Sequence, residues 1–120
     1  MEFSSCKLKA LVLTKDFEII KIVSYLLSTR NIVTYSSSNV EELNNEYCLI
    51  IVGSDIDTHL VVERLRKIKG ILPNVIFLEN GNYNFFNTPY LPCKCKRVLL
   101  PMGILNLEQH IDEVLNLHYS

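Results

Sequence analysis

Two carboxylates, Asp55 and Asp57, follow closely after the apolar segment CLIIV at residues 48–52. Many α/β proteins place a catalytic carboxylate at the tip of such a buried strand, where it can bind a metal ion or act on a substrate. Here the tip is Gly53, and the nearest carboxylate stands two residues further on. The segment therefore indicates either a site that has shifted by two residues or a site that has been lost.

Five short apolar segments, rich in β-branched residues, must position these carboxylates. They are too continuous to be one-sided strands of an exposed sheet, so we expect strands buried on both faces of a parallel sheet. The predicted strands are residues 8–13, 32–35, 48–52, 75–78 and 97–100.

Helical patterns follow the first two predicted strands. Asp16 is predicted to cap the first helix, and the capping-box pair Ser38 and Glu41 is predicted to open a short second helix that ends by about Asn45. The predicted buried stripe of the first helix is Ile19, Ile22, Val23 and Leu26.

Two further helices follow the third and fifth predicted strands. The third helix is expected from about Thr58 with Gly70 as its left-handed C-terminal cap, and the last from about Asn106, which pairs with Gln109 in a capping pattern. Asp57 would cap the third helix. The predicted buried positions are Val61, Leu65 and Ile68 in the third helix and Leu107, Ile111, Val114 and Leu115 in the last.

This alternation of strands and helices predicts one domain, residues 1–120, of the α/β class. We expect a single doubly wound, five-stranded parallel sheet of flavodoxin-like type with strand order 2-1-3-4-5. The segment 79–96 has no helical period and carries Pro89 and Pro92, so an extended loop is expected there in place of a fourth helix.

The balance of charge sets limits on the partners. Twelve basic and thirteen acidic side chains give a net charge of −1, so no overall field would attract nucleic acid. The apolar runs are far short of the ~20 residues that cross a bilayer. The N-terminal residues lack the order of a secretory signal, so we expect a cytoplasmic protein with free thiols, such as Cys6 and Cys48.

The predicted arrangement resembles the receiver domain of two-component response regulators over nearly the whole chain. Receiver domains place an acidic pair after the first strand to hold Mg²⁺ and a phosphorylatable Asp after the third. They add a Thr or Ser after the fourth strand and a Lys followed by Pro after the fifth, because the metal and the lysine together offset the charge of the transferred group.

Most of these positions are changed here, although Pro101 is retained and Asp16 matches a weaker third acidic position. The resemblance therefore implies a degenerate receiver, or pseudo-receiver: a phosphorylation-independent signalling or regulatory module that acts by protein–protein interaction, without enzymatic activity or a cofactor. The changed positions are Thr14 and Lys15 at the acidic pair, Gly53 at the phospho-acceptor, Glu79 at the hydroxyl residue and Leu100 at the lysine.

Two alternatives concern the same end of the sheet. In the shifted-site alternative, Asp55 is an atypical phospho-acceptor that works with Mg²⁺, and Asp16 and Asp55 are its metal ligands. In the other, Lys15 replaces Mg²⁺ by forming an internal ion pair with Asp16, Asp55 or Glu79, although Lys15 could equally be a solvated loop residue.

Four aromatic residues, Tyr83, Phe85, Phe86 and Tyr90, lie in the predicted loop. In receivers this region, together with the fifth strand and last helix, contacts partners or a second copy. The resemblance thus implies a protein partner, or a homodimer, bound by these aromatics with Lys96 and Arg97. Alternatively, the aromatics fold inward and cover the sheet.

The cysteines of the same segment, Cys93 and Cys95, lie among three basic residues, an environment that lowers thiol pKa. A redox or metal role is one reading. Structural zinc sites, however, usually show a second ligand pair at recognisable spacing, and His59, His110 and His118 do not cluster. Incidental cysteines are the other reading.

Overall fold

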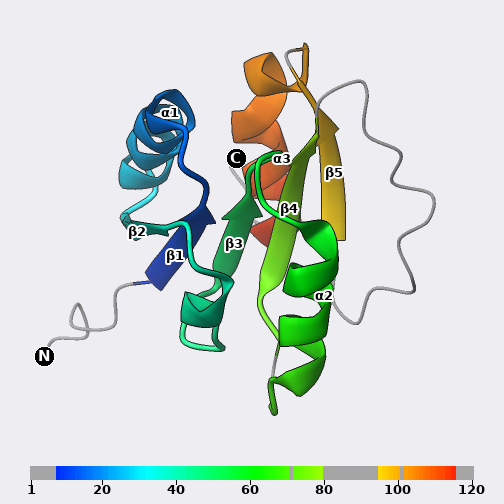
Figure 1. Cartoon of the computed structure of the whole chain (residues 1–120). Helices are drawn as coiled ribbons and strands as arrows, with labels where there is room; N and C mark the ends of the chain where they lie inside the picture. The colour runs from blue at the N-terminus through cyan, green and yellow to red at the C-terminus, as the bar shows by residue number, and fades with distance from the viewer. Residues whose placement is uncertain (1–7, 71, 80–94, 101, 116–120) are drawn as a thin grey trace, which may run out of the picture.

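Five parallel strands form one sheet in the order β2-β1-β3-β4-β5, as the sequence predicts (Figure 1). The computed structural model describes residues 8–70, 72–79, 95–100 and 102–115, the side chains of 102 and 103 excepted. The strand bounds lie within two residues of the predicted ones: β1 Leu8–Leu13, β2 Ile32–Ser37, β3 Leu49–Val52, β4 Asn74–Glu79 and β5 Cys95–Leu99.

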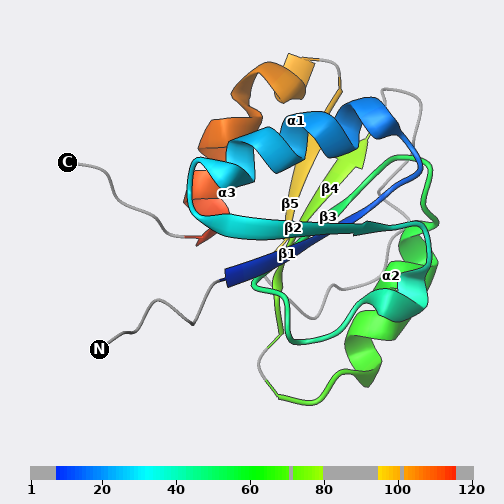
Figure 2. The same ribbon diagram turned by 90° about the vertical axis from the view of Figure 1, so that its left-hand side faces the viewer.

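The helices cover the two faces of the sheet unequally (Figure 2). Helices α1 (Phe17–Ser28) and α3 (Leu107–Leu115) lie on one face, and α2 (Thr58–Lys67) lies on the other. Two 3₁₀ turns, η1 (Val40–Glu42) and η3 (Met102–Asn106), complete the regular structure of the described residues. No helix in this part of the chain is long and apolar enough to cross a bilayer.

Alternating side chains of the strands form two separate cores, one on each face. The core under α1 and α3 consists of Ala10, Val12, Val23, Leu27, Ile32, Leu49, Ile51, Ile76, Leu78, Val98, Leu107 and Ile111. The core under α2 and η1 consists of Leu11, Leu13, Leu43, Ile50, Val52, Val61, Leu65, Val75 and Phe77.

Helix α1 begins as predicted, because the Asp16 carboxylate caps it by accepting a hydrogen bond from the Glu18 N–H. The predicted buried stripe was partly wrong. Val23 and Leu27 are the fully buried residues, whereas Ile22 is 38% exposed. The buried face is centred on Val23 and Leu27, which turns Ile22 toward solvent.

The predicted second helix was wrong, because only the single turn η1 forms there. Its cap is Asn39 and not Ser38, since the Asn39 side chain accepts from the Glu41 N–H. Beyond η1 the chain is extended at Leu43, which is fully buried, and Arg64 of α2 donates to the Leu43 carbonyl. The burial of Leu43 and this hydrogen bond end the turn.

One turn does not cover the sheet as a helix would. Val33 and Tyr35 of β2 consequently remain 37% and 45% exposed on the α2 side. The expectation of strands buried on both faces was therefore wrong for β2, and it is confirmed for β3, which is buried throughout.

Helix α2 is capped by Asp57, as predicted, but its end differs from the prediction. The helix ends at Lys67 because Ile68 is extended, and Gly70, at φ +97°, adopts the predicted left-handed conformation beyond the cap position. In α3, Leu107 and Ile111 are buried as predicted. Gln109 contacts Glu113, four residues on, rather than Asn106.

Candidate functional site

The carboxyl ends of the strands bring together residues that are distant in sequence. Thr14 and Lys15 follow β1, Gly53 follows β3 and Leu100 follows β5. All four line one hollow of about 350 Å³, together with Asp16 and Asp55. Glu79, at the end of β4, instead lines a smaller adjoining cavity of about 20 Å³ beside Gly53 and Ser54. The structure thus assembles the positions that the sequence singled out.

Asp55 is turned back toward the loop that follows β1. Its Oδ1 accepts a hydrogen bond from the Thr14 hydroxyl at 2.7 Å, and its Oδ2 accepts from the Lys15 backbone N–H at 2.9 Å. The Thr14 hydroxyl also accepts from the Asp16 N–H at 3.1 Å. We call the Thr14–Asp55 hydrogen bond, with its Lys15 N–H contact, the Thr14–Asp55 clasp. It occupies both oxygens of the carboxylate.

Gly53 lies directly against this clasp. A Cβ atom at position 53 would lie 2.6 Å from Thr14 Oγ1 and 2.7 Å from Asp55 Oδ1, closer than real Cβ atoms come to such neighbours. The clasp therefore fills the space in which a side chain at position 53 would begin, and glycine is required there by close approach.

The hypothesis of a Lys15 ion pair is not confirmed. Lys15 reaches Asp55 through its backbone N–H, and its ammonium forms no ion pair within the part of the chain that the structure describes. Its charge acts on Asp55 only as a weaker, longer-range attraction.

The environment of Asp55 favours its ionised form. Partial burial raises the pKa of this carboxyl, but the hydrogen bonds from Thr14 and from the Lys15 N–H outweigh burial, so the pKa lies below its ordinary value. The Thr14 side chain that makes one of these bonds is itself almost completely buried. Asp55 is therefore ionised at neutral pH.

This lowered pKa predicts a pH-dependent contribution to stability. Because the folded-state pKa of Asp55 is below that of the unfolded chain, the stabilisation is present above about pH 4, the ordinary pKa of Asp, and is lost as the pH falls through the folded-state value. We expect the free energy of unfolding of the wild type to exceed that of Asp55→Asn at pH 7 and the difference to shrink below pH 4. Urea unfolding from pH 7 to pH 3 measures it, and a constant difference would contradict the role of the clasp.

Glu79 ends β4 and Leu100 follows β5, at positions where the resemblance to receivers implies a hydroxyl residue and a lysine. Burial raises the pKa of Glu79, and the attraction of Arg97 on β5 offsets this in part. One Glu79 oxygen, Oε2, is buried without a hydrogen-bond partner among the described residues. Leu100 packs against the core under α1 and α3, so this position contributes an apolar group.

The remaining predicted site residues are not gathered in this hollow. Tyr83, Phe85, Phe86, Tyr90 and Cys93, like Pro101, lie outside the described residues. Lys96 is paired with Glu113 of α3, and Cys95 is half-buried at the start of β5. Burial raises the pKa of the Cys48 thiol.

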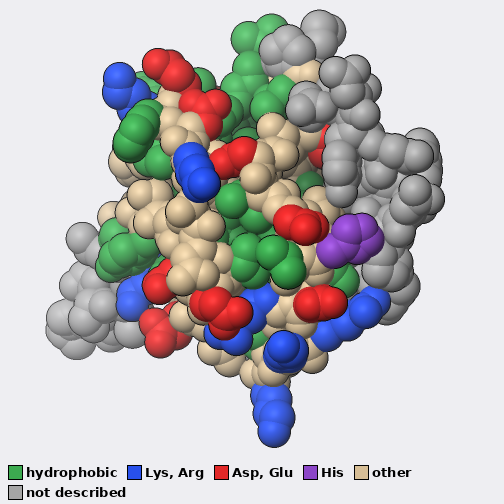
Figure 3. Space-filling view, in the orientation of Figure 1, with side chains coloured by type: hydrophobic (Ala, Val, Ile, Leu, Met, Phe, Trp, Pro, Cys, Tyr) green, Lys and Arg blue, Asp and Glu red, His purple; other side chains and the backbone are tan. Residues whose placement is uncertain are grey.

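Neither the surface charges nor the possible metal ligands of the described residues indicate a second candidate site. Within the described ranges, no group of three or more His, Cys, Asp or Glu side chains could hold a metal ion. Acidic side chains lie among the basic ones on the face shown in Figure 3, in line with the near-zero net charge.

A solved structure with the same architecture is a response regulator receiver protein from Burkholderia phymatum. The two chains superpose with a TM-score of 0.68, covering 95% of this chain and 99% of that one, at 14% sequence identity. This chain has the receiver fold. No family model matches the sequence, and no curated protein does so. The structural comparison therefore establishes the fold of this chain, at a sequence identity too low to carry over an activity.

Proposed function

We propose that this protein is a cytoplasmic signalling or regulatory module that works without phosphorylation and without enzymatic activity, by binding another protein. The observation that supports this proposal most strongly is the Thr14–Asp55 clasp. It lies against Gly53 at the position of the phospho-acceptor, and a Cβ there would overlap it.

The surroundings of the clasp also argue against phosphoryl transfer. Transfer to a carboxylate requires a metal ion and a fixed cation to offset the charge on the moving group. Leu100 provides no cation after β5, and Glu79 adds a second negative charge close to Gly53. The cation that does line the hollow, Lys15, follows β1, where a metal-binding acid would be needed. The charges of the hollow are therefore placed differently from those that the reaction uses.

The donor set does not fit Mg²⁺ well. Asp55 uses both oxygens in hydrogen bonds, and Asp16 uses Oδ1 to cap α1, so a cation bound there would compete with contacts that the fold already uses. Lys15 brings a like charge to the same hollow. No step of the proposed function passes through a metal ion.

One observation favours the alternative, an atypical phospho-acceptor that uses Asp55. The lowered pKa of Asp55 keeps this carboxylate ionised, and Asp16 lines the same hollow. In this alternative Asp55 would have to break the Thr14 hydrogen bond to reach a phosphoryl donor.

Amide NMR of labelled protein separates the two functions. Spectra are recorded with Mg²⁺ alone and then with Mg²⁺ and beryllofluoride, which mimics an aspartyl phosphate. We expect no saturable shifts around Asp55 and Asp16, because the clasp occupies the carboxylate oxygens.

Asp55→Asn is the matched control for this titration. Saturable shifts that appear in the wild type and vanish in Asp55→Asn would refute the proposal and establish the atypical acceptor.

The proposed partner surface comprises the aromatic residues of segment 79–96 with Lys96 and Arg97. The double variant Tyr83→Ala and Phe85→Ala tests this surface. We expect it to lose binding to the protein that is recovered with the wild type.

A further inference from the structure

Among the described residues, strand β2 forms one edge of the sheet and pairs with β1 alone (Figures 1 and 2). Its sequence, IVTYSS, contains no charged residue, no proline and no glycine. All six residues are in register with β1, without a bulge. Proteins usually protect edge strands with lysines, prolines or bulges, because the free edge of a strand pairs readily with another strand. Strand β2 has none of these protections.

The backbone of β2 offers hydrogen-bonding groups at this edge. The Ser37 carbonyl accepts a hydrogen bond from the Thr14 N–H, so Ser37 directs its backbone groups toward β1. Because successive residues of a strand point these groups to opposite sides, the N–H and C=O groups of Thr34 and Ser36 face the open edge. They have no partner among the described residues, and such groups favour pairing when they are removed from water.

The side chains beside this edge are apolar and accessible. Val33 and Tyr35 are exposed because η1 does not cover them. The Tyr35 ring packs edge-on against Tyr47, with 6.1 Å between the ring centroids. The exposed face of β2 therefore presents an aromatic ring that packs on a neighbour of the same copy.

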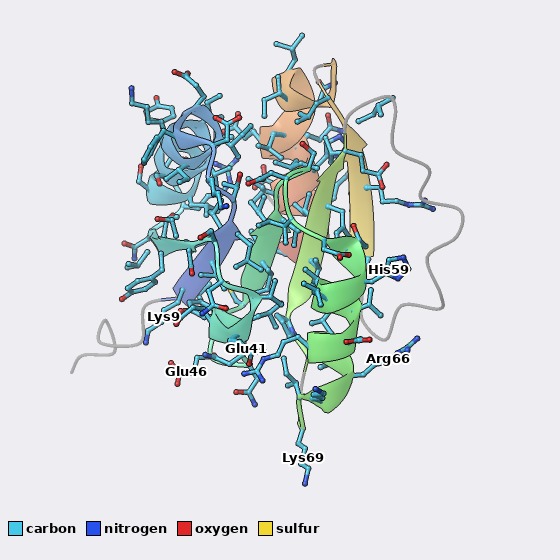
Figure 4. All side chains as sticks on the ribbon, viewed as in Figure 1. Lys9, Glu41, Glu46, His59, Arg66 and Lys69 are labelled. Carbon is cyan, nitrogen blue, oxygen red and sulfur yellow. The ribbon has the colours of Figure 1, made fainter. Side chains whose placement is uncertain are left out.

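Few charges lie close to the edge. Lys9 of β1 lies 6.0 Å from the centre of the Tyr35 ring and pairs with Glu46 at 3.7 Å (Figure 4). Glu42 adds one further acidic side chain close enough to Tyr47 to act on its hydroxyl. The surface therefore carries only a small negative charge, and its repulsion of an identical surface is weak and screened by salt.

We propose that a second copy of this chain binds this edge, with the two β2 strands antiparallel about a two-fold axis at Thr34. The residues with outward backbone groups, Ile32, Thr34 and Ser36, are placed symmetrically about that axis. Thr34 then pairs with the second copy's Thr34, and Val33 lies opposite the second copy's Tyr35 on the exposed face. The strand is thus complementary to itself in both backbone and side chains.

The area of contact sets the expected strength of the dimer. One six-residue strand pair with its flanking side chains is smaller than the roughly 1,600 Å² of a standard stable interface. We therefore expect a reversible dimer whose population depends on concentration. This inference adds a second surface, the β2 edge, to the proposed function, and it does not depend on whether Asp55 accepts a phosphoryl group.

Two measurements on the wild-type protein test the dimer. Sedimentation velocity from about 5 µM to about 500 µM should show a rising dimer fraction. Amide hydrogen exchange over the same range should slow at Thr34 and Ser36, whose N–H groups face the edge, and change less at Val33 and Tyr35, whose N–H groups face β1. Alternating protection along β2 is expected only if its edge pairs with another strand, so it distinguishes this interface from others.

Three variants locate the interface. Thr34→Pro removes the outward N–H and leaves the hydrogen bonds to β1 intact. Tyr35→Lys puts a charge at the edge, and Tyr25→Lys makes the same exchange at an exposed residue of α1. We expect Thr34→Pro and Tyr35→Lys to raise the dissociation constant at least about tenfold and Tyr25→Lys to change it less than about twofold.

A wild type that stays monomeric throughout would overturn the proposal and would leave a strand of a different protein as the candidate occupant. A dimer that persists in both edge variants would overturn it as well. Thermal unfolding shows whether each variant is folded; if Thr34→Pro is not, Tyr35→Lys and the exchange pattern of the wild type decide. The beryllofluoride titration is separate, so failure here is distinguishable from failure of the proposed function.

Discussion

Gly53→Ala is expected to destabilise the protein by about 2–3 kcal/mol, because the new Cβ would overlap the Thr14–Asp55 clasp. The overlap is with Thr14 Oγ1 and Cβ and with Asp55 Oδ1, all within 2.7 Å. Asp55 could swing away, but Thr14 is almost completely buried and cannot. Urea unfolding at pH 7 measures the loss.

A double-mutant cycle assigns this loss to the clasp. Thr14→Gly removes the atoms that the Cβ would meet and frees Asp55 to rotate, so Gly53→Ala should cost less than about 1 kcal/mol in that background. Gly70→Ala is the matched control. Its cost of about 1 kcal/mol comes from the positive φ of Gly70 and not from crowding, so Thr14→Gly should not reduce it.

Equal costs of Gly53→Ala in both backgrounds would show that the clasp does not set the requirement for glycine. The same cycle bears on the proposed function. If the space at position 53 were free, a carboxylate could be introduced there by one substitution, whereas a crowded position needs at least one further change at Thr14.

The topology could be predicted from sequence because it depends on short-range patterns. Each apolar segment is a few residues long, and the helix caps Asp16 and Asp57 act on N–H groups two residues away. A 2-1-3-4-5 order then follows from the connection rules for parallel sheets. The positions at the carboxyl edge of the sheet follow from the same topology.

The clasp could not be predicted because it joins residues 41 positions apart in sequence. The sequence shows a threonine after one strand and an aspartate two residues after another, and neither spacing indicates a bond. The need for glycine at position 53 is hidden for the same reason, since it depends on the direction of the Asp55 side chain.

The prediction of a second helix was wrong because of a tertiary contact as well. Ser38 and Glu41 have the spacing of a capping box, but Asn39 caps the turn and Arg64, from α2, ends it. Local propensity was overridden by a contact across the fold. Because η1 is only one turn long, it leaves one face of β2 exposed. The inferred dimer edge depends on this exposure.

Arg30 links α1 to α3 on the face of the sheet that these two helices cover, and no local sequence pattern predicts this link. It follows α1, and its guanidinium donates to both carboxylate oxygens of Asp112 and to Glu108 of α3. The same group donates to the Leu26 carbonyl at 2.8 Å. Its side chain is only 6% exposed, whereas that of Glu108 is 58% exposed. The pair with Asp112 therefore joins α1 to α3 in partly buried surroundings.

We expect Asp112→Ala to lower the free energy of unfolding by about 2–4 kcal/mol, because it leaves the buried Arg30 guanidinium without its two-pronged partner. Arg30→Met should cost less, about 1–2 kcal/mol, since it removes the buried charge and keeps an apolar chain of similar length. Glu46→Ala, which breaks the exposed pair with Lys9, is the matched control and should change stability by less than about 1 kcal/mol.

The order of these three effects tests whether Arg30 is a buried charge, and denaturant unfolding of all three variants at pH 7 measures it. The cost of removing Asp112 should exceed that of removing Arg30 only if the guanidinium is the buried member that cannot regain water, as the 6% exposure of its side chain indicates. If Arg30→Met is the more damaging variant, the contacts of the guanidinium with the end of α1 matter more than its charge pair. If all three variants match the wild type, the association of α1 with α3 depends on the apolar core between them alone.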